Sequence, residues 1–168
     1  MPSRTLLPLS TLRAVSCSAH KMRGRVVRDR RWVYDPHSGG DKIPALVRER
    51  TERRIREHAK KRYSGRYARL AIRFRGPLCY IDAFIEPTEP SRRDLRLLDE
   101  TREQYMTRLR NAPIHLCRLR YFGKEEAWSL AFFRYSNERY EPCVFHNGTF
   151  LGTPEEAFDV GAVYLQAL

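Results

Sequence analysis

Arginine and aromatic residues alternate with apolar residues through four segments that the sequence predicts to be strands. In an extended strand, alternate side chains point to the same side of the sheet. The residues that we expect together on one side are Arg69, Arg73, Arg75, Tyr80, Phe84, Arg118, Arg120, Phe133 and Tyr135. Because guanidinium groups bind phosphate and aromatic rings stack on exposed bases, this mixture is typical of a surface that binds single-stranded nucleic acid.

A second interpretation of this surface is structural. The side of the sheet that carries the arginines also carries apolar residues, and a sheet that is apolar on both sides is often covered on both. The predicted helix between Ser91 and Asn111 is the element that could lie over it. The sequence leaves both interpretations open: a binding platform, or the floor beneath this helix.

Metal binding is a further chemistry that the residue types allow. The candidate ligands are His115 and Cys117, Cys143 and His146, and Cys79. The predicted strand order places Cys117 and Cys143 on opposite sides of Phe132, about 9 to 10 Å apart at two strand spacings. This separation is too large for a shared zinc ion or a disulfide bond. We therefore predict buried thiols, with no metal and no cofactor.

Carboxylates could serve a metal-dependent nuclease if the fold gathered them. The acidic residues that could supply such a cluster are Asp82, Glu86, Asp94, Asp99, Glu100 and Glu103. Their spacing matches no recognised ligand pattern. Asp82 is predicted on the arginine side of the sheet, where a lone carboxylate is more often the charge partner of an arginine.

The first element that positions these residues is a predicted β-hairpin over residues 68–86. Apolar residues alternate on both sides of Gly76-Pro77, which forms the loop. With a two-residue loop, Arg73 pairs with Tyr80. The expected core face of this hairpin consists of Leu70, Ile72, Phe74, Cys79 and Ile81.

A second hairpin is predicted from residues 114–122 and 127–135, which alternate in the same way. A further strand follows a turn at 136–139, in a register that places Tyr140 opposite Tyr135. The two hairpins together account for about five antiparallel strands.

Three helices complete the predicted fold. A second helix over 91–111 separates the hairpins, and Thr153-Pro154 begins a C-terminal helix with the capping-box pattern. The first helix, over residues 44–63, repeats a buried position every four residues, at Val47, Thr51, Ile55, Ala59 and Tyr63. We therefore predict an α+β fold with an antiparallel sheet of about five strands and three helices.

Length and charge narrow the class of protein. The chain has 168 residues, the size of one domain, and a formal net charge of +12, which favours a polyanionic partner. Residues 1–30 hold seven basic residues and one acid, so half of this charge lies in a segment that we interpret as a disordered basic tail. This segment either contains a targeting peptide or is not translated up to residue 21, because Met22 is the true initiator. Residues 31–168 form the single predicted α+β domain.

The four cysteines and the hydropathy pattern indicate the compartment. Four cysteines in a chain of this size do not make a disulfide framework. No apolar run approaches the roughly 20 residues of a membrane span. We therefore expect a cytoplasmic protein in a reducing environment that does not enter the membrane.

The order of these elements resembles a group of short bacterial proteins classed as a domain of unknown function. The likeness rests on the basic helix, on the string CRLRYFGKEEAWSLAFFRYSNERYEP at 117–142 and on the closing TPEEAF at 153–158. It covers about residues 31–165, and the helix between the hairpins departs from the shorter members. The resemblance implies a bacterial origin and no assigned catalytic residue.

These observations together predict a non-catalytic, nucleic-acid-associated protein that binds single strands through the arginine side of its sheet. The alternative is a protein-interaction or regulatory module whose aromatic surface meets a partner chain. A metal-dependent nuclease is the third hypothesis.

Overall fold

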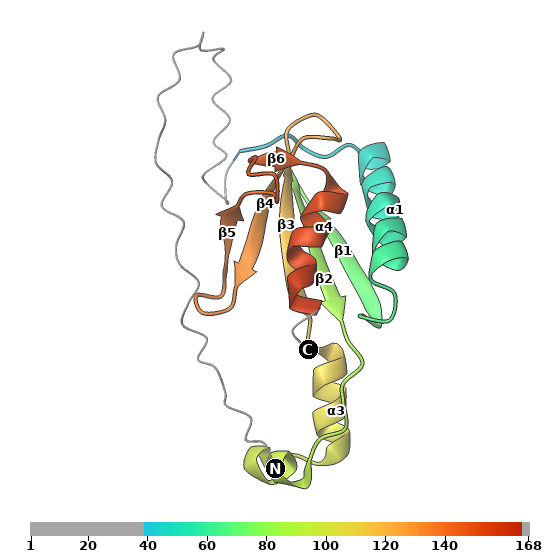
Figure 1. Ribbon diagram of the computed structural model, residues 1–168, viewed down its shortest axis with the longest axis vertical. Coiled ribbons are helices and arrows are strands. Elements are labelled where there is room, and N and C mark those ends of the chain that lie inside the picture. The colour runs from blue at the N-terminus through green and yellow to red at the C-terminus, as the bar shows by residue number, and fades with distance from the viewer. Residues whose placement is uncertain (1–38, 166–168) are drawn as a thin grey trace. The chain divides into compact units, whose positions relative to one another are not determined.

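The computed structural model describes residues 39–165 (Figure 1). The predicted tail at 1–30 and the question of Met22 lie outside these residues. The described elements are α1 Ala45–Arg62, β1 Arg69–Arg75, β2 Leu78–Phe84, α2 Arg92–Leu98, α3 Arg102–Asn111, β3 Ile114–Tyr121, β4 Trp128–Arg134, β5 Arg139–Cys143, β6 Leu151–Gly152, α4 Pro154–Gly161 and the 3₁₀ helix η1 Ala162–Leu165. The α+β class is confirmed, with six strands and four α-helices in the described part of the chain rather than about five and three.

The sheet is antiparallel, in the order β1-β2-β3-β4-β5, and β6 pairs with the beginning of β4. The predicted registers of both hairpins are confirmed. Arg73 pairs with Tyr80 across β1 and β2, and Tyr121 pairs with Trp128 across β3 and β4. Because a shift by one residue would turn every side chain to the other face, these registers assign each side chain to a face.

The register between β4 and β5 differs from the prediction by two residues. Tyr140 pairs with Phe133 rather than with Tyr135. The four-residue turn occupies 135–138 instead of 136–139, since Glu138 adopts a left-handed φ of 51° and the Asn137 N–H donates to the Arg134 carbonyl at 3.2 Å. A shift by two leaves every side chain on its predicted face.

The hydrophobic core lies between the sheet and two helices that pack on one of its faces. Helix α4 packs against β3, and α1 lies beside α4 (Figure 1). The predicted stripe of α1 is confirmed, because Val47, Thr51, Ile55, Ala59 and Tyr63 are all buried. A Cβ at Gly161 would lie 2.9 Å from the Leu116 carbonyl carbon, so a small residue lets α4 approach β3 closely.

The predicted helix at 91–111 is two short helices. Helix α2 ends at Asp99, which adopts a left-handed φ of 51°. Thr101 then begins α3 with its own capping box, in which its side chain accepts from the Gln104 N–H and the Gln104 side chain accepts from the Thr101 N–H. Both helices lie beyond the end of the sheet (Figure 1). Of the two interpretations that the sequence left open, the one in which this segment lies over the arginine side therefore does not apply.

No helix within residues 39–165 combines the length and the apolar content that a membrane crossing needs.

Candidate nucleic-acid interface

The face of the sheet opposite α1 and α4, which we call the arginine face, brings together side chains from all of the long strands. One row across the sheet runs from Arg73 through Tyr80 and Arg118 to Ala131. A neighbouring row contains Arg75, Leu78, Arg120 and Ser129, and a third contains Ala71, Asp82 and His115. The eight predicted site residues that lie within strands share this face, and Tyr135 lies in the turn directly after β4.

Five rings on the arginine face form a continuous group, which we call the aromatic cluster: Tyr80, His115, Phe133, Tyr135 and Tyr140. The His115 and Phe133 ring centroids are 4.5 Å apart, and Phe133 lies 5.0 Å from Tyr135 and 5.1 Å from Tyr140. Tyr135 is 49% exposed and the other four are half-buried. The cluster therefore offers ring surface to solvent while its members hold one another in place.

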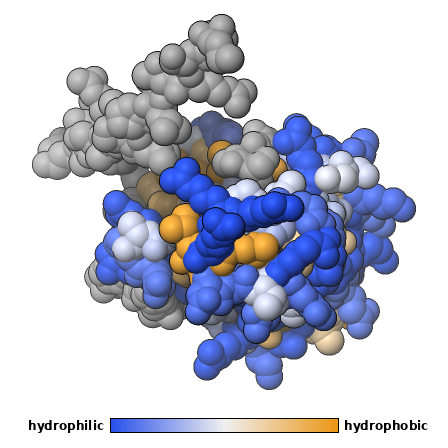
Figure 2. Space-filling view, turned by 90° about the horizontal axis from the view of Figure 1, so that it is seen from below, coloured by the Kyte–Doolittle hydropathy of each residue, from blue (hydrophilic) through white to orange (hydrophobic). Residues whose placement is uncertain are grey.

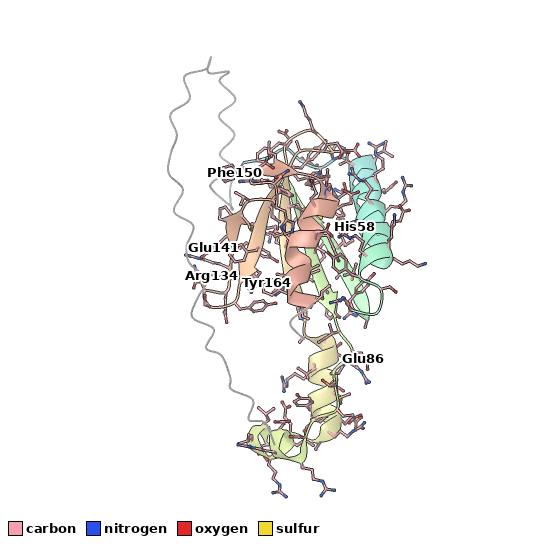
Figure 3. The ribbon with its side chains drawn as sticks, in the orientation of Figure 1. His58, Glu86, Arg134, Glu141, Phe150 and Tyr164 are labelled. Carbon is pink, nitrogen blue, oxygen red and sulfur yellow. The ribbon has the colours of Figure 1, made fainter. Side chains whose placement is uncertain are left out.

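Tyr164 anchors the cluster from the C-terminal side of the fold. Its hydroxyl donates to the Phe133 carbonyl at 2.9 Å, and its ring lies 5.6 Å from the Tyr135 ring. Figure 3 shows Tyr164 at the lower end of α4, on the side of the sheet edge formed by β4 and β5. This contact fixes the end of β4, from which Tyr135 extends.

The pKa values of two phenols in the cluster are raised. Burial is the main cause for Tyr140, and the negative charge of Asp82 adds to it. Burial likewise raises the pKa of Tyr135. Both hydroxyls therefore stay protonated at neutral pH, so that the rings present no negative charge to a phosphate group.

Three predicted arginines lie on β1, an edge strand of the sheet, and are exposed: Arg69, Arg73 and Arg75. The Arg69 guanidinium carbon lies 3.4 Å from the centroid of the Phe84 ring, which is buried. Arg73 binds Asp82 and keeps 62% of its side chain exposed. Within residues 39–165, no ion pair holds Arg69 or Arg75. Two of the three cations can therefore bind an anion without first leaving a carboxylate.

At the opposite edge of the sheet, formed by β5, the arginines are paired with a carboxylate. Arg134 of β4 and Glu141 of β5 project side by side (Figure 3), with 3.2 Å between Nη1 and Oε2. Arg139 contacts the same carboxylate at 3.2 Å. Glu141 therefore partly neutralises both arginines, which by their register lie on the side of the sheet opposite the arginine face.

The two predicted arginines on β3 are buried. Arg118 is 5% and Arg120 is 3% exposed. The Arg118 guanidinium lies 4.7 Å from the Tyr140 ring centroid, and the Arg120 guanidinium lies 5.3 Å from that of Phe122. Both guanidinium groups thus pack against aromatic rings, an arrangement stabilised by cation–π attraction, and present little surface to solvent.

Asp82 and His115 form a polar contact at the centre of the face. Asp82 is 2% exposed, and its carboxylate accepts from Arg73 Nη2 at 2.5 Å, as a charge partner of the arginines should. Its other oxygen lies 2.7 Å from His115 Nδ1. This role of His115 was not predicted from the sequence, because simple alternation along the strand assigns His115 to the core face with Cys117. A bulge between Ile81 and Asp82 shifts the register and turns His115 to the arginine face.

The cysteines and the other acidic residues have separate places. Cys79 and Cys117 are fully buried in the core, and burial raises the pKa of both thiols. In the described part of the chain, no three His, Cys, Asp or Glu side chains could hold a metal ion together. Glu86 pairs with Arg110, and Glu100 pairs with Arg108. Asp82 is thus set apart from the other candidate carboxylates.

The fold and this site define an α+β protein whose antiparallel sheet packs against helices on one face and carries arginines and aromatic rings on the other. The chain matches no family model, no curated protein and no solved structure. The resemblance to short bacterial proteins therefore stays a prediction.

Proposed function

We propose that this protein binds single-stranded nucleic acid through the arginine face. The observation that carries the proposal is the row of exposed β1 arginines beside the aromatic cluster, on a face that neither α1 nor α4 covers. Flexible single strands place phosphates against cations and splay bases onto rings, and every base has a face that can stack. The net charge of +12 adds long-range attraction to any polyanion.

The first test removes charge from the edge of the sheet. The double variant Arg69→Ala/Arg75→Ala should bind a single-stranded oligonucleotide about tenfold more weakly, the equivalent of roughly 0.7 kcal/mol for each exposed contact. It should also lower the slope of log Kd against log salt by about 1.4, since each phosphate contact on a single strand contributes about 0.7. Fluorescence anisotropy at several salt concentrations measures both quantities.

A matched control removes the same charge elsewhere. Arg93 and Arg96 lie exposed on α2, away from the sheet. Arg93→Ala/Arg96→Ala should leave the slope unchanged. Equal losses in the two double variants would show that only net charge matters, and a flat salt response of the unaltered protein would contradict the proposal.

The second test separates stacking from hydrogen bonding at Tyr135. Tyr135→Ala should weaken binding by about 1–3 kcal/mol if a base stacks on this ring. Tyr135→Phe keeps the ring but loses the hydroxyl that accepts from the His115 backbone N–H at 2.9 Å. We expect the Phe variant to keep most of the affinity, and equal losses in both variants would instead assign the effect to the hydroxyl.

A protein partner is the second candidate, favoured by an apolar surface on α2. Leu97 and Leu98 are 74% and 50% exposed. Figure 2, which views the molecule from the end where α2 and α3 lie, shows a group of hydrophobic side chains among hydrophilic ones. Exposed leucines of this kind are typical of surfaces that meet another protein.

A further inference from the structure

The hydrogen bond between His115 and Asp82 determines which nitrogen of the imidazole carries the proton. Asp82 is paired with Arg73, and an ionised carboxylate can only accept hydrogen bonds. Nδ1 of His115, 2.7 Å from Asp82, must therefore be the donor. In the neutral ring this leaves the lone pair on Nε2, and no side chain or backbone group within residues 39–165 hydrogen-bonds to that nitrogen. The imidazole is thus oriented to accept a proton.

The surroundings of His115 supply access for a ligand, a neighbouring cation and aromatic stacking surface. The His115 side chain is 26% exposed, so a ligand on the arginine face can reach it. Arg73 binds the same carboxylate, which places an exposed cation close to the imidazole. The aromatic cluster surrounds the ring with stacking surface. In RNA the 2′-hydroxyl of the substrate can act as the nucleophile that attacks the neighbouring phosphate. The protein then needs to supply a proton acceptor, a cation for the phosphate and aromatic rings that hold the nucleobases.

We propose that this protein cleaves single-stranded RNA without a metal ion, with His115 as the general base. The inference rests on the proposed function, since the RNA must first bind to the arginine face. It departs from the sequence-based expectation of a non-catalytic protein. Asp82 acts as a positioning residue that holds the tautomer, and Arg73 balances the negative charge that grows on the phosphate.

The reaction is an internal transesterification. His115 Nε2 takes the proton of a ribose 2′-hydroxyl, and the 2′-oxygen forms a bond to the adjacent phosphorus. The bond from phosphorus to the 5′-oxygen breaks, and that oxygen leaves with a proton from water. The imidazolium then returns its proton to the hydroxide that remains. The products are a 2′,3′-cyclic phosphate and a 5′-hydroxyl, and nothing is oxidised or reduced.

The test uses the full chain, a labelled single-stranded RNA and EDTA. We expect cleavage with 2′,3′-cyclic phosphate ends. His115→Gln should lower kcat by about 100-fold or more, because Gln can still donate to Asp82 but cannot accept the proton. His115 also belongs to the aromatic cluster, so the comparison is made in single turnovers at saturating RNA, where kcat is read separately from any change in affinity. Equal cleavage rates in the wild type and in His115→Gln, prepared identically, would overturn the proposal.

A substrate-side measurement does not depend on how the variant folds. A DNA strand with one ribonucleotide should be cut only on the 3′ side of that ribonucleotide, and the all-DNA strand should bind without being cut. If the protein binds the RNA strand and the DNA strand with one ribonucleotide but cleaves neither, the catalytic inference is overturned and the binding function stands. Absence of binding to both RNA and DNA would overturn the proposed function and the inference with it.

Discussion

Replacing Phe158 by Ala is expected to lower the free energy of unfolding by about 3–5 kcal/mol, the range for a large aromatic side chain removed from a core. Phe158 of α4 is fully buried. Its ring centroid lies 5.4 Å from that of Tyr63 and 6.2 Å from that of His58, both in the C-terminal part of α1 or just after it. The ring therefore fills the space between the two helices that cover the sheet. Urea denaturation followed by circular dichroism measures the loss.

Val163 provides the control for this substitution. It lies five residues further along the chain and is 56% exposed, so Val163→Ala should change stability by less than about 0.5 kcal/mol. A loss below about 1 kcal/mol in Phe158→Ala would contradict the placement of α1 and α4 around one core.

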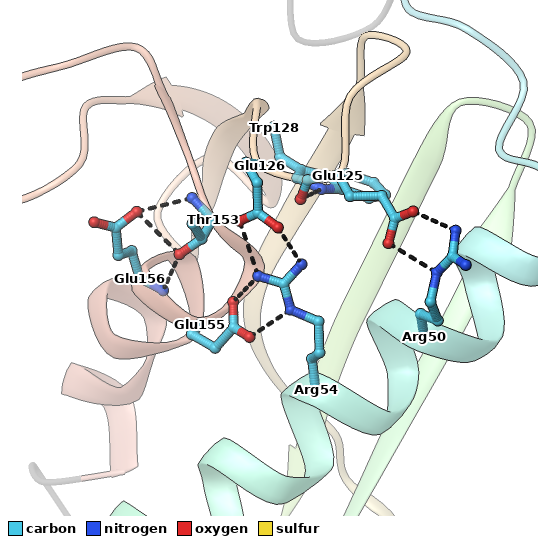
Figure 4. A network of polar contacts seen from close by, with 8 residues as sticks. All are labelled: Arg50, Arg54, Glu125, Glu126, Trp128, Thr153, Glu155 and Glu156. Atoms are coloured by element: carbon cyan, nitrogen blue, oxygen red, sulfur yellow. Dashed lines mark hydrogen bonds and ion pairs between the residues drawn. The ribbon is translucent and has the colours of Figure 1, made fainter.

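Replacing Arg54 by Met is expected to lower the free energy of unfolding by about 2 kcal/mol, the range for hydrogen bonds between charged groups. Figure 4 shows the Arg54 guanidinium of α1 between two carboxylates. It donates to Glu155 through Nε at 2.6 Å and Nη2 at 2.8 Å, and to Glu126 at 2.9 and 3.1 Å. The contact ties α1 to the start of α4 and to the loop between β3 and β4, and Met keeps the apolar stem of the side chain.

Arg50 is the matched control, one turn earlier on α1. It pairs with Glu125 of the same loop, also in Figure 4, but 48% of its side chain is exposed against 26% for Arg54. Exposed pairs contribute little, so Arg50→Met should cost less than about 1 kcal/mol. Equal losses at Arg50 and Arg54 would contradict the assignment of a special role to the half-buried pair.

The effect of the Arg54 variant should depend on pH. Burial by itself would raise the pKa of Glu155, but its hydrogen bonds with Arg54 outweigh this and lower the pKa below the ordinary glutamate value. A carboxyl whose pKa is lower in the folded state stabilises the fold above its unfolded pKa, and this contribution is lost as the pH falls through the folded pKa. The stability difference between the wild type and Arg54→Met should therefore be full at pH 6 and should shrink below about pH 4.

The hairpin registers could be predicted because alternation and turn chemistry are local. Gly76-Pro77 and the loop at 123–126 each leave one frame in which apolar residues face one side. The turn after Arg134 allowed two frames that differ by two residues, and both keep the same faces. The conformation of Glu138, at φ 51°, decided between them.

The division of the helix at 91–111 also had a sequence signal. Thr101 and Gln104 have the capping-box spacing, which marks a new helix start within an otherwise continuous pattern. The two capping boxes divide the segment into helices of seven and ten residues, α2 and α3. Its position beyond the end of the sheet is set by the tertiary structure (Figure 1).

At the candidate site, the face on which each strand residue lies could be predicted from the sequence, whereas its exposure to solvent could not. Alternation along each strand determined that the arginines and the aromatic residues share one face, because successive side chains of a strand point to opposite sides. Their exposure depended on the strand order. Arg73 lies on the edge strand β1 and is open to solvent, whereas Arg118 lies on the central strand β3 and is buried. The bulge beside Asp82 brought His115 into the site, and that bulge exists only in the pairing of β2 with β3.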